Sequence, residues 1–298
     1  MNKEKPSATA ALILKVVLVA ATDELYPHLV APDSAQLSQT MAKDILKYPG
    51  IFLFLIKNKC IRWLIRISEK LLNKGFILHV AARKKYIEKL ALEAVDKGCT
   101  QVIVIGAGYD TLGLRMAKNA SHLTCLEVDH PITQKSMQSS LSNTSLPPNF
   151  YFIPADLSLL SISEVLQNQT LFDASKKTLI IIEGVLMYLT ENNVNTLLTE
   201  LITLFPKDLH LIFTFMDKRS DGDITFVSAS PLINWWLRRK QENFLWGIAK
   251  NDITKKMNDI GFSCVSVIGK EDFIAEYFHN QSPEPVLAEG EMICHVSI

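Results

Sequence analysis

Short apolar runs alternate with longer amphipathic segments through the middle of the chain. The runs rich in β-branched and aromatic residues predict seven strands, near residues 101–105, 123–128, 150–154, 178–182, 209–215, 263–268 and 291–297. Apolar residues at helical spacing predict helices near 111–119, 131–141, 191–204 and 251–259. This alternation predicts an α/β fold with a doubly wound, seven-stranded, mostly parallel sheet.

The first hundred residues show a helical pattern instead. It predicts helices near 7–21, 34–47, 51–73 and 80–97, and Gly98 is placed to end the last of them. The chain shows no repeat, low-complexity tract or linker. We therefore expect one domain in three parts: a helical cap over residues 1–100, a core over 101–217 and a C-terminal part over 218–298 that contains the last strands.

The first predicted strand ends in two closely spaced glycines. Gly106 and Gly108 let the backbone turn sharply and let a ligand approach where a Cβ would obstruct it. The second strand ends at Asp129, which places a carboxylate beside this turn, within reach of ribose hydroxyls. The core therefore resembles a nucleoside-binding βαβ unit, although a plain tight turn would need the same glycines.

The glycine spacing separates two classes of nucleoside ligand. The dinucleotide fingerprint G-x-G-x-x-G would need glycine at position 111, where this chain has Thr111. A ligand with a nucleoside and no phosphates fits better, and S-adenosylmethionine is the common one. A nicotinamide-dependent oxidoreductase stays open as an alternative from a different class.

Four sequence blocks occur in a recognisable order. They are QVIVIGAGYDT at residues 101–111, LEVDHP at 126–131, ADL at 155–157 and EGVLMYL at 183–189. This series resembles the leucine carboxyl methyltransferase family, which includes bacterial O-methyltransferases similar to those of polyketide pathways. The resemblance implies a class I, Rossmann-like methyltransferase that binds S-adenosylmethionine and methylates an oxygen. One departure is Leu112, where the family usually has arginine, although Arg115 is kept.

The glycine turn and the residue after strand two receive roles from this interpretation. Gly106, Ala107 and Gly108 are expected to contact the methionine part of the cofactor, and Asp129 is expected to bind the ribose diol. The alternative for Asp129 is a helix N-cap ahead of Pro131.

Further candidates follow strands three and four. The resemblance implies that Asp156 and Leu157 lie beside the adenine, and a helix N-cap is again the alternative. Glu183 and Tyr188 follow the apolar run at 178–182. A glutamate there would be partly desolvated and needs a partner, either the cofactor's ammonium group or a cationic side chain in a structural ion pair.

Two basic residues of the helical cap complete the expected cofactor site. The resemblance implies that Arg83, ahead of strand one, holds the cofactor's carboxylate, a task that suits a planar guanidinium. It also implies a weaker role for Lys15 at the same carboxylate. The alternatives are a solvated face for Arg83 and a snorkelling side chain for Lys15. The sequence identifies no metal site and no catalytic base among His79, His130, His210 and Tyr188.

The acceptor is expected to be a small molecule. A protein C-terminal carboxylate and a non-catalytic, ligand-binding relative are the alternatives. We expect residues 51–73 and the segment from Trp235 to Trp246 to face each other across the transferred methyl group, because both carry more apolar and aromatic side chains than a solvated surface needs.

Composition narrows the class of protein. The chain has 298 residues, 48% of them hydrophobic, which is enough for a large core. Zero formal net charge gives no attraction to nucleic acid. Five scattered cysteines without a C-x-x-C pair predict neither a disulfide framework nor a zinc site, and favour a cytoplasmic location.

Two segments raise the question of a membrane. Residues 8–21 imitate a signal peptide, but Lys15 interrupts the apolar run. Residues 51–72 form a basic amphipathic pattern, which fits either a packed surface helix or peripheral contact with a bilayer. No run of eighteen uncharged apolar residues exists, so we expect no membrane-spanning segment.

Overall fold

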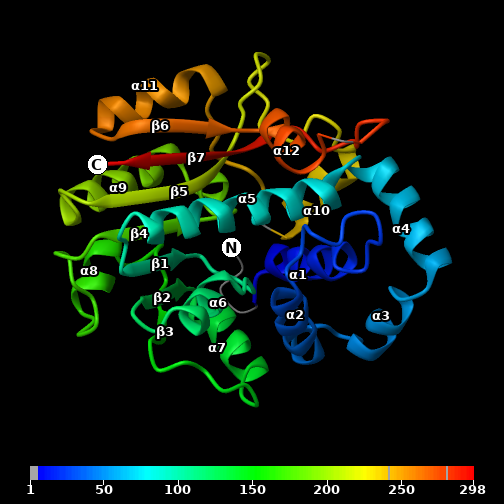
Figure 1. Cartoon of the computed structure of the whole chain (residues 1–298). Helices are drawn as coiled ribbons and strands as arrows, with labels where there is room; N and C mark the ends of the chain where they lie inside the picture. The colour runs from blue at the N-terminus through cyan, green and yellow to red at the C-terminus, as the bar shows by residue number, and fades with distance from the viewer. Residues whose placement is uncertain (1–5, 241, 280) are drawn as a thin grey trace.

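The centre of the computed structural model, which describes residues 6–240, 242–279 and 281–298, is a seven-stranded sheet in the order β3-β2-β1-β4-β5-β7-β6 (Figure 1). The strands are β1 (Gln101–Ile105), β2 (Thr124–Asp129), β3 (Phe150–Pro154), β4 (Thr178–Ile182), β5 (Leu209–Met216), β6 (Ser263–Ile268) and β7 (Glu291–Ser297). Strands β1 to β5 pair in parallel, whereas β7 is antiparallel to both of its neighbours. The predicted strands and the mostly parallel sheet are confirmed.

Helices cover both faces of this sheet. One core lies under α5 (Phe76–Asp96), α6 (Leu112–Asn119), α7 (Pro131–Ser140) and α12 (Lys270–Tyr277). The other lies under α8 (Ile162–Gln167), α9 (Glu191–Leu204) and α11 (Lys250–Ile260). Successive side chains of β1 alternate between the two, with Val102 and Val104 in the first core and Ile103 and Ile105 in the second.

Four helices lie beyond the carboxyl ends of the parallel strands, on the right in Figure 1. They are α1 (Ala8–Ala20), α2 (Pro32–Ile45), α3 (Pro49–Leu55) and α4 (Lys59–Leu72). The prediction of one helix over 51–73 is wrong. Ile56 is buried in the core, and the Asn58 side chain accepts from the backbone N–H groups of Cys60 and Ile61, which starts a second helix.

Three helices and a 3₁₀ turn were not predicted from the sequence. They are α8, α10 (Pro231–Lys240), α12 and η1 (Leu186–Tyr188). Helix α8 has six residues, which is too short for the repeated apolar spacing on which helix prediction depends. Turn η1 matters for the site because it carries Tyr188.

Candidate active site

The turn after β1 needs glycine at two positions. Gly106 and Gly108 have φ angles of +71° and +59°, in the left-handed region that favours glycine. A Cβ on Gly106 would lie 2.3 Å from Cγ2 of Val185, and one on Gly108 would lie 3.1 Å from Cβ of Ala10. Helix α1 therefore lies directly over the glycine turn, and Ala107 is buried between the two glycines.

Asp129, at the end of β2, is bonded to this turn. Its Oδ2 accepts from the N–H of Gly108, and its Oδ1 accepts from the N–H of His130. It is not the cap of α7, because the His130 side chain accepts from the N–H of Ile132 at 3.4 Å. A carboxylate has about four lone-pair sites, so Asp129 keeps the capacity to accept from hydroxyl groups. Burial raises its pKa, although both N–H groups lower it.

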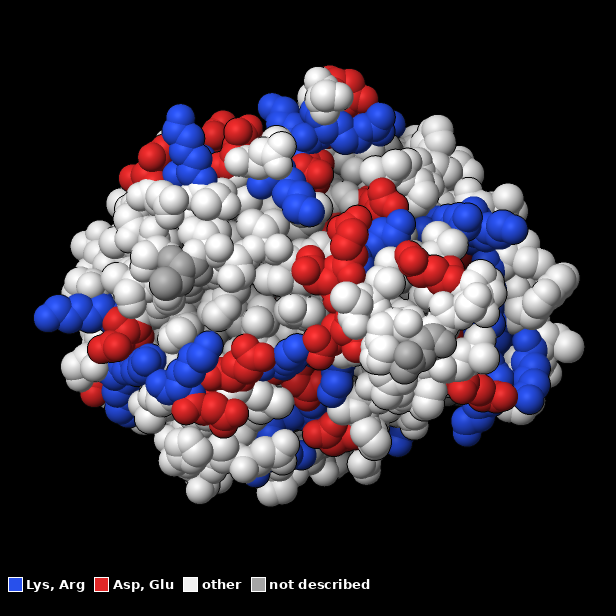
Figure 2. All heavy atoms as spheres, turned by 45° about the horizontal axis from the view of Figure 1, so that its top comes forward, with Lys and Arg blue, Asp and Glu red and all other residues white. Residues whose placement is uncertain are grey.

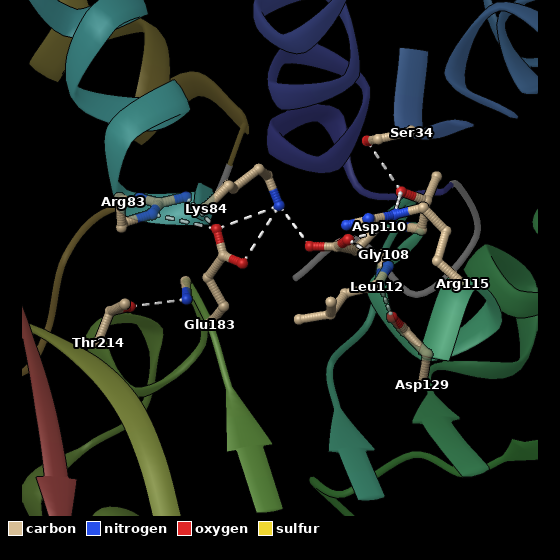
Figure 3. Close-up of polar contacts among 12 residues, drawn as sticks. Ser34, Arg83, Lys84, Gly108, Asp110, Leu112, Arg115, Asp129, Glu183 and Thr214 are labelled. Atoms are coloured by element: carbon tan, nitrogen blue, oxygen red, sulfur yellow. Dashed lines mark hydrogen bonds and ion pairs between the residues drawn. The ribbon is translucent and has the colours of Figure 1, made fainter. Parts of the chain in front are cut away.

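A row of buried and half-buried charges lies beside the glycine turn, and Figure 3 shows its members Arg83, Lys84, Asp110 and Glu183. We call Arg83, Lys84, Asp110, Glu183 and Glu291 the charged row. Arg83 donates from Nε and Nη2 to Oε1 of Glu183, at 3.1 and 2.6 Å, and from Nη1 to Glu291. Lys84 donates to Oε2 of Glu183 at 3.2 Å and to Asp110. Glu183 thus has cationic partners within the protein, as one of the sequence interpretations expected.

Pairing keeps these groups charged despite burial. Desolvation alone would raise the pKa of Glu291, but the Arg83 guanidinium together with His79 and Thr214 outweighs it and lowers that pKa to about 2. Desolvation is likewise outweighed at Asp110, whose pKa is lowered by Lys84, and at Lys84, whose pKa is raised by Asp110 and Glu183. With two cations and three carboxylates, the charged row has a net charge of −1.

A cavity of about 30 Å³ lies between the charged row and the N-terminal helices. Its wall includes Leu112, the residue that stands in place of the family's usual arginine. Arg115, one turn later, donates from Nε to Oγ1 of Thr111 at 3.3 Å and pairs with Glu88 of α5. The Thr111 hydroxyl is 3.0 Å from that of Ser34, so Thr111 links α6 to α2 in place of the fingerprint glycine.

The loop after β3 brings a second carboxylate to the same edge of the sheet. Oδ1 of Asp156 accepts from the N–H and the hydroxyl of Ser158, at 2.9 and 2.6 Å. Its Oδ2 is 3.8 Å from Nε2 of His130, next to Asp129 in the chain. The cap of α8 is Ser161 and not Asp156. Leu157 is half-buried beside it.

Tyr188, on η1, packs within a group of aromatic side chains. Its hydroxyl is hydrogen-bonded to Thr9, and burial raises its pKa. Ring centroids are 5.6 Å apart for Tyr188 and Phe244, 6.3 Å for Phe244 and Phe226, and 5.4 Å for Phe226 and Phe76. These four residues, which we call the aromatic group, pack in one apolar cluster with Met187 and Met216.

The segment from Trp235 to Trp246, which was expected to line the acceptor site, is divided between the core, the surface and the aromatic group. Trp246 is buried in the core under α9 and α11, and Trp235 is exposed on α10. Phe244 is the member of that segment that reaches the aromatic group. Residues 51–73 meet the stretch just before α10, where the N–H of Ser230 donates to the carbonyl of Leu72 at 2.7 Å.

Glu242 fixes the start of α1 above the site. This buried carboxylate accepts from the N–H groups of Ala8 and Thr9, at 3.1 and 2.8 Å, and from the Ser7 hydroxyl at 3.2 Å. Lys15 lies on the exposed face of α1, whereas Thr9, Ala10 and Val17 of this helix reach the site.

Sequence reasoning missed four charged residues that the structure brings to the site: Lys84, Asp110, Glu242 and Glu291. Two of them carried a usable signal. Asp110 is two residues after Gly108. Glu291 is the only carboxylate within the apolar run at 291–297, and the argument from desolvation that identified Glu183 applies to it as well. The pairings of Lys84 and Glu242 depend on residues far away in the chain.

Comparison with known proteins adds a family assignment. The leucine carboxyl methyltransferase family model matches residues 22–202. YktD of Bacillus subtilis, whose name describes an S-adenosyl-L-methionine-dependent methyltransferase, is 28% identical over 46% of this chain and 45% of its own. Rv3399 of Mycobacterium tuberculosis, named in the same way, is 22% identical over 68% of this chain and 60% of its own. The chain thus spans about half the length of the relatives it matches.

Solved structures agree on the fold. A methyltransferase structure from Thermobifida fusca has a TM-score of 0.56 at 17% identity and covers 80% of this chain and 88% of that one. A DUF574 family protein from Streptomyces avermitilis has a TM-score of 0.52 at 10% identity and covers 74% of this chain and 84% of that one. The class I methyltransferase architecture is therefore shared.

Proposed function

The chain belongs to the leucine carboxyl methyltransferase family, and we propose that it transfers a methyl group from S-adenosylmethionine to an oxygen of a small organic acceptor. The observation that carries this proposal is the charged row, at the carboxyl ends of strands where ligands of open α/β sheets bind. It offers cations and carboxylates alternately, which is the arrangement that an amino-acid head group with both charges requires.

The charged row fits the methionine part of this cofactor. Arg83 and Lys84 would bind its carboxylate, and Glu183 would accept from its ammonium group. The ligand's carboxylate would replace a protein carboxylate as the partner of the cations, and its ammonium group would replace a protein cation as the partner of Glu183. No buried charge would then lose its compensation. The net charge of −1 favours the positive sulfonium, which supplies the activated methyl group.

The nucleoside part would extend along the ends of β1, β2 and β3. The turn at Gly106 and Gly108 allows close backbone approach, Asp129 would accept from the ribose hydroxyls, and Asp156 with Leu157 would lie beside the adenine. Lys15 keeps the role that the resemblance implies only if α1 rotates, because its side chain is on the exposed face.

The acceptor would lie against the aromatic group, whose apolar rings suit a small organic molecule. A carboxylate acceptor is favoured, because it is ionised at neutral pH and needs no base. Tyr188 stays protonated because burial raises its pKa. His79 and His210 are not placed to act as a base either. The side chain of His79 is 1% exposed, and His210 pairs with His295 at the other end of β5. Orientation and exclusion of water would then supply most of the catalysis.

The test is a transfer assay with radiolabelled S-adenosylmethionine against a panel of aromatic and aliphatic carboxylic acids, phenols, and peptides with a free C-terminus. The proposal expects methylated small acceptors, either methyl esters, which are base-labile, or methyl ethers, which are not. It also expects loss of transfer in Asp129→Ala. Transfer only to peptide C-termini would favour a protein carboxyl methyltransferase. Cofactor binding without transfer to any oxygen acceptor would favour a non-catalytic relative.

A further inference from the structure

Helices α3 and α4 expose an unusual amount of apolar surface. Neither helix contains a buried residue. Phe54 is 75% exposed, Leu71 74% and Trp63 62%. The exposed large apolar side chains of this region are Tyr48, Ile51, Phe54, Leu55, Trp63, Leu64, Ile67 and Leu71. We call these eight residues the apolar face.

The part of this face on α4 is a continuous stripe. Leu64, Ile67 and Leu71 are three and four residues apart, which places them on one side of the helix. Ile61 and Ile65 are less exposed, and Ile65 packs against the core. The helix therefore has one apolar side for the protein and a second apolar side that points to solvent.

Positive charge surrounds the apolar face. Residues 47–74 contain seven Lys or Arg and a single acidic residue, Glu69, in a chain whose net charge is zero. Asp23 and Glu24 pair with Arg66, Arg62 and Lys59, and even when both are counted the excess is four positive charges (7 − 1 − 2). In Figure 2, blue side chains border white ones on the right, where α3 and α4 lie.

We propose that α3 and α4 dock on an anionic lipid bilayer. An amphipathic helix with a basic border lies in the membrane interface with its apolar side among the acyl chains. Trp63 and Tyr48 suit the headgroup level, and Lys57, Lys70 and Lys74, all exposed, would reach anionic headgroups. Among the described residues, no helix is long and apolar enough to cross a membrane.

Charge favours a bilayer over a second copy of the chain. In a twofold dimer the same patch meets itself, so the lysines around the apolar face would oppose one another. An anionic bilayer supplies the missing negative charge instead, at about 1 kcal/mol for each Lys or Arg near the surface.

The experiment is co-sedimentation of the full chain with vesicles of phosphatidylcholine, with and without phosphatidylglycerol. We expect binding that needs phosphatidylglycerol and weakens with salt. Trp63→Glu/Leu71→Glu, at exposed positions, should lower the partition coefficient by at least about tenfold. Leu159→Glu, at an equally exposed leucine after β3, is the matched control and should bind normally.

A second pair of variants tests the charge separately. Lys57→Glu/Lys70→Glu should lower binding by at least about tenfold, while Lys255→Glu on α11 should not. The proposal is overturned if the wild-type chain stays in the supernatant with anionic vesicles. It is also overturned if light scattering shows a dimer that Trp63→Glu/Leu71→Glu dissociates, since a second copy would then cover the apolar face.

Discussion

Nε and Nη2 of Arg83 both donate to Oε1 of Glu183, at 3.1 and 2.6 Å, across a separation of one hundred residues. The pair joins α5 to the end of β4, and the two side chains are 5% and 9% exposed. Charges this deep are stable only with partners. The same pair therefore supports the fold and presents the charges that an amino-acid head group would take over.

Acid should weaken the fold through Glu291. Its pKa is about 2 in the folded chain, below the usual 4.5, because Arg83, His79 and Thr214 together outweigh the effect of burial. A lowered folded-state pKa gives stability that is complete above 4.5 and is lost as the pH falls towards 2. Urea unfolding from pH 7 to pH 2.5 should therefore show a smaller loss of unfolding free energy in Glu291→Gln than in the wild type. An equal loss of unfolding free energy in the two proteins would show that Glu291 does not contribute to the acid sensitivity.

A methyl group should be rejected at Gly106 in the glycine turn and tolerated at Gly184 after β4. Gly106→Ala combines a positive φ with a Cβ 2.3 Å from Val185, whereas Gly184→Ala has a similar φ of +67° and no atom within 4 Å. We expect a cost of about 1 kcal/mol for Gly184→Ala and a further 1–3 kcal/mol for Gly106→Ala. Gly106→Ala/Val185→Ala should recover part of the difference. Equal costs for the two single variants would show that Val185 moves aside freely.

Removal of Glu242 should loosen α1 above the site. Glu242→Ala leaves the first N–H groups of this helix without an acceptor and should cost about 1–2 kcal/mol. Hydrogen exchange should accelerate within residues 8–20. The control is Ser161→Ala, which removes the capping box of α8 and should leave exchange in α1 unchanged. If Glu242→Ala does not change exchange in α1, this carboxylate does not hold the helix.

The adenine side of the site has a closely matched control. Asp156 and Asp173 each accept from the N–H and hydroxyl of the serine two residues later, at 2.9 and 2.6 Å. Only Asp156 lies at the proposed nucleoside site. Asp156→Ala should weaken binding of S-adenosylhomocysteine by about 1.5–3 kcal/mol, and Asp173→Ala should not change it. Similar affinities for the two variants would remove Asp156 from the site.

The strands of the sheet could be predicted from the sequence because each is a short apolar run that is separated from the next by other residues. All seven strands and the glycine turn were predicted in this way. The split between α3 and α4 was not, because the apolar pattern continues through Ile56 and the break depends on the cap at Asn58. The sequence also suggested Glu183 and Arg83, each on separate grounds, as residues of the cofactor site. Their bond to each other, and those to Lys84 and Glu291, arise from packing over long separations.

The site at the ends of β1, β2 and β4 is expected to bind S-adenosylmethionine. The most direct test is isothermal titration with S-adenosylhomocysteine and, separately, with NAD. We predict saturable binding of S-adenosylhomocysteine, weakened by about 2–4 kcal/mol in Asp129→Ala because two charge-assisted hydrogen bonds to the ribose are lost, and no binding of NAD. Binding of NAD without binding of S-adenosylhomocysteine would contradict the account and would favour an oxidoreductase.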